Sequence, residues 1–145
     1  MTKFRMIRIA VDQFAILSNS YPENEISYSV GIGFKYAAEQ RRIICVVGIN
    51  FQSNNEKFLI LAVSCEFIVD EESWSSFINE SDSKLIIPKD FLEYLAVHTV
   101  GVTRGIMHCK TEGTPLNMII LPPINVRDII SEGIVDSLSD VQQEL

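Results

Sequence analysis

The sequence predicts an α+β protein in which a four-stranded antiparallel sheet is followed by two helices packed on one face. Two observations support this prediction. Residues 4–69 contain four segments in which apolar side chains recur at every second position, the period of a strand. From Pro88 onward, apolar residues form broad bands at helical spacing instead. The chain has 145 residues, which suits one domain spanning residues 1–145.

The alternation is most regular in residues 26–37, 41–52 and 57–69, and less regular in residues 4–17. The side chains expected to share one face of the three regular strands are Ile26, Tyr28, Val30, Ile32, Phe34, Tyr36, Ile43, Cys45, Val47, Ile49, Phe51, Leu59, Leu61, Val63, Cys65, Phe67 and Val69. Asn54 and Asn55 tolerate left-handed backbone and predict a turn. Because the connections are short, we expect hairpins and an antiparallel meander. Apolar residues such as Ile44 and Val46 fall on the opposite face, so we expect part of it to be covered.

The second half begins with a polar, Ser-rich link around Trp74 and Phe77, in which one helical turn is expected. Pro88 then opens a long helix at a favourable first-turn position. Gly101 and Gly105 are costly in a helix, so they indicate close packing or an earlier helix end. Gly113 is the expected stop of this helix.

Residues 114–130 contain an apolar run, Met118 to Leu121, followed directly by Pro122 and Pro123. Proline fixes φ and has no N–H to donate, so these two residues interrupt regular backbone pairing. We expect residues 114–124 to cross a surface in extended form. Asn125 is the expected N-cap of a final helix, which weakens at residues 131–133.

Composition excludes several classes of function. The net charge is −7, and no Lys/Arg stripe is present that could neutralise nucleic-acid phosphates, so no nucleic-acid partner is expected. No window approaches the roughly 18 consecutive apolar residues of a membrane helix, so no membrane insertion is expected. The N-terminus lacks the pattern of a signal peptide, which predicts a cytoplasmic protein. Three widely spaced cysteines fit a reducing compartment.

The sequence offers little catalytic chemistry, and we expect neither an enzyme nor a metal or cofactor. His98 and His108 do not have the i, i+4 spacing of a metal-binding pair. Cys45 and Cys65 fall on apolar strand faces, where cysteine usually acts as a small core residue, although a Cys–His nucleophile pair stays open. Arg104 lies in an otherwise apolar helix, so it is either a surface charge or, as we favour, the ion-pair partner of a carboxylate on a neighbouring element. The apolar surface exceeds what a small sheet and two helices can bury, which favours oligomerisation, client binding, or both.

The order of these elements and several motifs resemble the SecB family of protein-export chaperones, across nearly the whole chain. The motifs that match the family pattern are Phe4, Ile9 and Phe14 in the first strand; Ile86, Ile87 and Pro88 at the main helix start; Arg104 and Gly105; Pro115, Leu116, Asn117, Pro123, Ile124 and Asn125; and Asp128. The chain departs from the pattern in two places. Nine residues separate Gly105 from Pro115, several more than in the family, so the main helix is expected to run about two turns further. Leu61 stands where the family has an acidic residue that contacts the translocase motor.

The resemblance implies an ATP-independent holdase that binds unfolded polypeptides, such as preproteins for export, in apolar grooves as a homotetramer built from two dimers. It leaves two questions open: whether a translocase motor is a partner, and whether the client is general or a single protein such as an antitoxin. Two hypotheses compete with the holdase: a small oligomeric interaction protein without holdase activity, and a ligand-binding or enzymatic domain with a pocket between sheet and helix. The candidate client-binding residues, each of which could equally be core or oligomer interface, are Trp74, Phe77, Met118, Ile119, Ile120 and Leu121.

Overall fold

The computed structural model describes residues 1–138. Its principal sheet contains β1 (Phe4–Ile16), β2 (Ile26–Ala37), β3 (Arg42–Ser53) and β4 (Glu56–Val69). All neighbouring strands are antiparallel, as predicted, and Asn54 and Asn55 form the expected left-handed turn between β3 and β4, with φ of 56° and 63°. The alternating apolar side chains of β3 and β4 face the core.

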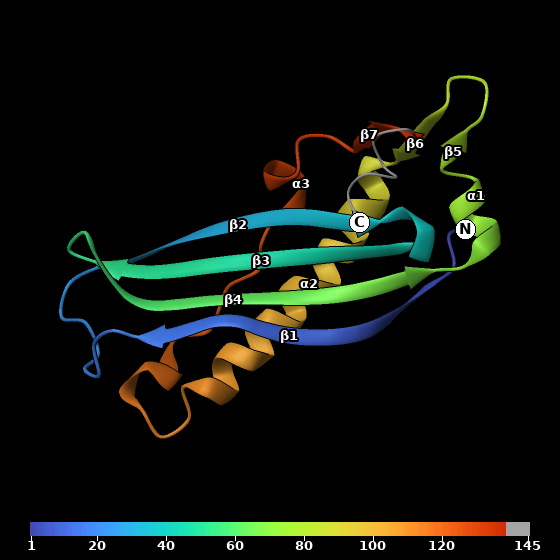
Figure 1. Ribbon diagram of the computed structural model, residues 1–145. Helices are drawn as coiled ribbons and strands as arrows, with labels where there is room; N and C mark the ends of the chain where they lie inside the picture. The colour runs from blue at the N-terminus through green and yellow to red at the C-terminus, as the bar shows by residue number, and fades with distance from the viewer. Residues whose placement is uncertain (139–145) are drawn as a thin grey trace.

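The predicted meander is wrong for β1. The strand order is β1-β4-β3-β2, so the N-terminal strand lies beside β4 and not beside β2 (Figure 1). This order is that of a Greek key. Residues 17–25 must therefore pass the end of the β3–β4 hairpin. They can do so because strands are about 4.8 Å apart, whereas nine extended residues reach about 30 Å.

One long helix, α2 (Lys89–Lys110), covers one face of the principal sheet and runs diagonally behind it in Figure 1. Pro88 is the N-cap of this helix and not its first helical residue, so the helix begins one residue later than predicted. The Pro88 backbone is extended, with φ −64° and ψ 146°. The helix continues without interruption past Gly101 and Gly105. A Cβ atom added at either glycine would meet nothing within 4 Å, so neither glycine is required by close packing within the chain. Among the described residues, no helix combines the length and apolar composition of a membrane span.

The sequence did not predict a second, three-stranded sheet of β5 (Ile78–Asn79), β6 (Lys84–Ile87) and β7 (Ile134–Ser137), with β6 in the middle. The predicted single helical turn in the Ser-rich link is confirmed as α1 (Glu71–Ser75), and Asp70 caps it. Short 3₁₀ turns occur at η1 (Ala38–Gln40) and η2 (Pro115–Met118).

The prediction of two helices on one face is correct for α2 and wrong for the final helix. The last helix, α3, is a single turn from Val126 to Ile129, capped by Asn125 as expected. The chain then returns as β7, because β6 offers an edge that pairs with it. The Tyr36 hydroxyl also donates a hydrogen bond to the Asp136 carboxylate, which joins β7 to the principal sheet.

Candidate functional site

The segment that joins α2 to α3, residues 114–124, is here called the crossover. Its first part is a 3₁₀ turn and not extended chain, which corrects the prediction for residues 115–118. The Thr114 hydroxyl accepts a hydrogen bond from the Leu116 N–H at 3.2 Å and donates one to the Thr111 carbonyl at 2.8 Å. The Asn117 amide donates to the His108 carbonyl at 2.8 Å. These bonds fasten the beginning of the crossover to the last turn of α2.

Arg104 fastens the second part of the crossover. Its Nε donates to the Leu121 carbonyl at 2.6 Å, and its Nη2 donates to the Pro122 carbonyl at 3.0 Å. The partner is thus backbone, which corrects the prediction that Arg104 pairs with a carboxylate. Pro122 and Pro123 have no backbone N–H, so this part of the crossover cannot be held by hydrogen bonds that these residues donate. The Arg104 guanidinium holds it instead, by donating two hydrogen bonds to its carbonyl groups.

The apolar run of the crossover alternates between the core and the solvent. Ile119 and Leu121 are buried, with 8% and 1% of their surface exposed, whereas Met118 and Ile120 are 76% and 61% exposed. This period of two is typical of extended backbone. Of the predicted client-binding residues on the crossover, only Met118 and Ile120 can therefore be reached by another polypeptide without a change in this structure.

Trp74 and Phe77, the remaining two predicted client-binding residues, lie in the core with 5% and 4% exposure. Their rings pack edge to face with centroids 5.7 Å apart, and Phe77 lies 5.6 Å from Phe91 of α2. Phe91 in turn lies 5.4 Å from Phe4 of β1. This aromatic chain ties α1 and β1 to the helix. The structure thus separates the predicted residues into a buried aromatic group and an exposed pair on the crossover.

A second apolar surface, which was not predicted as a binding site, lies along β2 at the edge of the sheet. Five side chains on its helix-facing side, Ile26, Val30, Ile32, Phe34 and Tyr36, are only half-buried against the core, and Tyr28 is exposed. Their alternation was visible in the sequence, but burial depends on how far α2 extends across the sheet. Because α2 lies against β3 and β4, the outer strand is left partly open.

The side chains with reactive groups include Cys45, Cys65 and His98. Cys45 and Cys65 face one another across β3 and β4 and are fully buried, and burial is the main cause that raises the pKa of the Cys45 thiol to about 12. His98 packs against the Tyr94 ring at a centroid distance of 4.9 Å. Within residues 1–138, no three His, Cys, Asp or Glu side chains gather as a metal site. That the protein is not an enzyme remains a prediction.

Comparison of the sequence with protein-family models and with curated proteins finds no match. Among solved structures, the chain is similar to a SecB-like chaperone of Mycobacterium tuberculosis, Rv1957, in complex with a ChAD peptide from the Rv1956 HigA1 antitoxin. The similarity has a TM-score of 0.47 at 11% sequence identity, and it covers 86% of this chain and 90% of that chain. At this level the similarity assigns neither a family nor a function.

Proposed function

We propose that this protein is an ATP-independent chaperone of the holdase type, which binds unfolded polypeptides on apolar surfaces. The observation that carries the proposal is the exposed pair Met118 and Ile120 on a crossover fixed by Arg104. Exposed apolar side chains on a firmly held segment can bind many sequences, because burial of apolar surface is not directional. The partly open side of β2 adds further apolar surface.

We also propose that the working form is a homo-oligomer, a tetramer built from two dimers, in the cytoplasm. Thirteen large apolar side chains are exposed in the described part of the chain. Three of them, Ile7, Ile9 and Val11, lie on β1, which is an edge strand with unpaired backbone groups. Exposed apolar edge strands are surfaces that proteins usually cover by association. This surface supports association but does not determine the number of subunits.

The experiment that tests the proposal measures light scattering by an unrelated denatured protein as it is diluted into buffer with this protein and without ATP. Suppression at a near-stoichiometric ratio would support a general holdase. If a well-folded sample gives no suppression, general holdase activity is excluded. A chaperone dedicated to one client, such as an antitoxin, or an interaction protein without holdase activity would then be the better hypothesis.

A translocase partner needs a separate measurement, because export and client binding are different functions. We propose that a motor contact, if the protein serves export, is made by residues other than Leu61, since its side chain is fully buried. Co-sedimentation of the purified protein with a translocase motor, with and without a bound client, tests this part of the function.

A further inference from the structure

The face of the principal sheet opposite α2, which no helix of residues 1–138 covers, carries a group of cations. Strand pairing places Arg5 and Arg42 on either side of Ile68, in one row across the sheet. The next row contains Arg8, Glu66, Ile44 and Lys35. Directly paired residues of neighbouring strands point to the same face, and alternate rows share that face about 7 Å apart. Side chains from four strands thus meet on one surface, here called the basic face.

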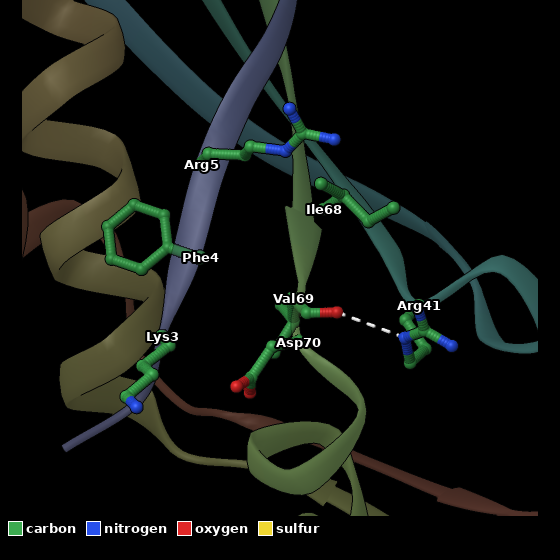
Figure 2. A pocket seen from close by; sticks show the side chains of 7 residues that line it. All are labelled: Lys3, Phe4, Arg5, Arg41, Ile68, Val69 and Asp70. Carbon is green, nitrogen blue, oxygen red and sulfur yellow. Dashed lines mark hydrogen bonds between the residues drawn. The ribbon is translucent and has the colours of Figure 1, made fainter.

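Two hollows mark the basic face and the end of the sheet beside it. The first, of about 350 Å³, is lined by Lys3, Phe4, Arg5, Arg41, Ile68, Val69 and Asp70. Figure 2 shows Arg5 beside Ile68 while Phe4 points to the opposite side of β1, toward the helix. The Arg41 Nε donates to the Val69 carbonyl at 3.1 Å, which fixes this cation at the rim.

The second hollow, of about 240 Å³, lies over the next rows of the same face. Arg8, Asp12, Lys35 and Glu66 line it together with small or apolar side chains. Ile44 and Val46 contribute its apolar surface. Neither hollow is lined by a residue of the crossover, so the basic face is a surface separate from the proposed client-binding one.

The charges in this region do not balance. The residues that line the two hollows include five cations, Lys3, Arg5, Arg8, Lys35 and Arg41, and three carboxylates, Asp12, Glu66 and Asp70. The lining residues therefore carry a charge of +2, in a chain whose net charge is −7.

Each carboxylate is moreover already engaged. Glu66 lies 3.4 Å from Arg42, Asp12 accepts from the Ser64 hydroxyl at 3.3 Å, and Asp70 caps α1 by accepting from the Ser73 N–H at 2.8 Å. By contrast, Lys3, Arg5, Arg8 and Lys35 form no ion pair with any described residue. Gathering like charges is unfavourable, and a bound anion would relieve their repulsion.

We propose that the basic face is a docking site for an acidic segment of a partner protein. Carboxylates two residues apart on an extended segment are about 7 Å apart, which matches the spacing of the Arg5 and Arg8 rows. Apolar side chains of the segment would fill the hollows over Ile68 and over Ile44 and Val46. Nucleic acid fits less well, because its long, dense run of phosphates would extend beyond the basic face and be repelled by the acidic remainder of the protein, whereas a short segment with a few carboxylates stays within this face.

The test is fluorescence anisotropy of a labelled peptide with the repeat Glu-Ser-Glu-Ser-Leu-Ser, titrated with the full chain; this repeat places Glu and Leu on the same side of an extended segment. The matched probes are the same peptide with Lys in place of Glu and a labelled single-stranded DNA. We expect the acidic peptide to bind in a salt-dependent way and the Lys peptide not to bind. Equal binding of both peptides, no binding of the acidic one, or tighter binding of the DNA would overturn the proposal.

The double variant Arg8→Glu, Lys35→Glu should weaken binding of the acidic peptide by about tenfold or more. The control, Lys57→Glu with Lys84→Glu, changes the net charge equally at exposed positions outside both hollows and should retain wild-type affinity. An equal loss of affinity for the acidic peptide in both double variants would also contradict the proposed site. Thermal melting reports whether each variant is folded. Suppression of aggregation should be the same in both variants, so failure of this proposal is distinguishable from failure of the holdase proposal.

Discussion

The guanidinium group of Arg104 holds the backbone of Leu121, with Nε 2.6 Å from the Leu121 carbonyl oxygen. A second bond, from Nη2 to the Pro122 carbonyl at 3.0 Å, completes a fork across the crossover. This contact explains how a segment ending in two prolines keeps a defined path. The prolines remove backbone donors, and a side chain on α2 supplies donors in their place.

Replacing Arg104 should destabilise the protein. In Arg104→Ala, two carbonyls lose charged donors, so the free energy of unfolding should fall by roughly 1.5–3 kcal/mol. Arg104→Lys should recover only part of this, because an ammonium group cannot reproduce the fork. Urea denaturation measures both. The control is Arg127→Ala, which removes an exposed ion pair of 3.7 Å to Glu93 and should cost less than about 0.5 kcal/mol. Equal effects of Arg104→Ala and Arg127→Ala would contradict the anchoring role.

The double variant Met118→Ser, Ile120→Ser should reduce suppression of aggregation while leaving the urea midpoint nearly unchanged. Both side chains are exposed, so their replacement should weaken client binding without disturbing the packing of the core. Val135→Ser on β7 is a control, since Val135 is 64% exposed and lies on a strand that pairs with β6. Unchanged suppression in the crossover variant would remove this surface from the proposal. Trp74 is unsuitable for this test, because its burial means that a charged substitution would act on folding first.

Two glycine substitutions should have opposite effects on stability. A Cβ atom at Gly133 would lie 2.4 Å from the Ile87 carbonyl oxygen and 2.9 Å from the Lys89 nitrogen, both backbone atoms, so Gly133→Ala should cost about 1–3 kcal/mol. Gly105→Ala meets nothing within 4 Å and should stabilise α2 by up to about 1 kcal/mol. Urea denaturation compares the two. If Gly105→Ala instead lowers the oligomer mass in light scattering, this side of α2 contacts another chain.

The buried thiol of Cys45 should make the folded state lose stability in alkaline solution. Its pKa is raised from 9.0 to about 12, chiefly by burial, with a smaller opposing effect of the Thr99 hydrogen bond. The unfolded chain therefore releases this proton near pH 9 while the folded chain retains it. The stabilising contribution is complete below about pH 9 and is lost as pH rises toward about 12.

The measurement is the free energy of unfolding in urea at roughly pH 8 and pH 10 for wild type and Cys45→Ala. The wild type should lose about 1.4 kcal/mol more than the variant over this interval. Using the difference between the two proteins cancels titration of the exposed lysines. Equal losses in both proteins would show that the Cys45 thiol ionises as easily in the folded state as in the unfolded chain.

Whether a prediction was correct depended on how far apart in the sequence the interacting residues lie. The Asn54–Asn55 turn and the Asn125 cap depend on nearby residues, and the sequence predicted them. The helix α2 ends at Lys110, three residues before the predicted stop at Gly113. The return of residues 134–137 to β6 depends on an edge formed some fifty residues earlier, and the helical pattern around Ile129 and Ile130 concealed it. The candidate residues Met118 and Leu121 looked equivalent in the sequence, yet one is exposed and the other buried.

The sequence by itself determined the four strands of the principal sheet, the face that β2, β3 and β4 turn to the core, and the position of the long helix, because alternation and helical spacing are local properties of the chain. Only the tertiary structure decided that β1 lies beside β4, that Arg104 holds the crossover, and that cations from different parts of the first 42 residues gather on one face. These features depend on strand order and register. Strand order and register are set by packing between distant segments, which no window of sequence contains.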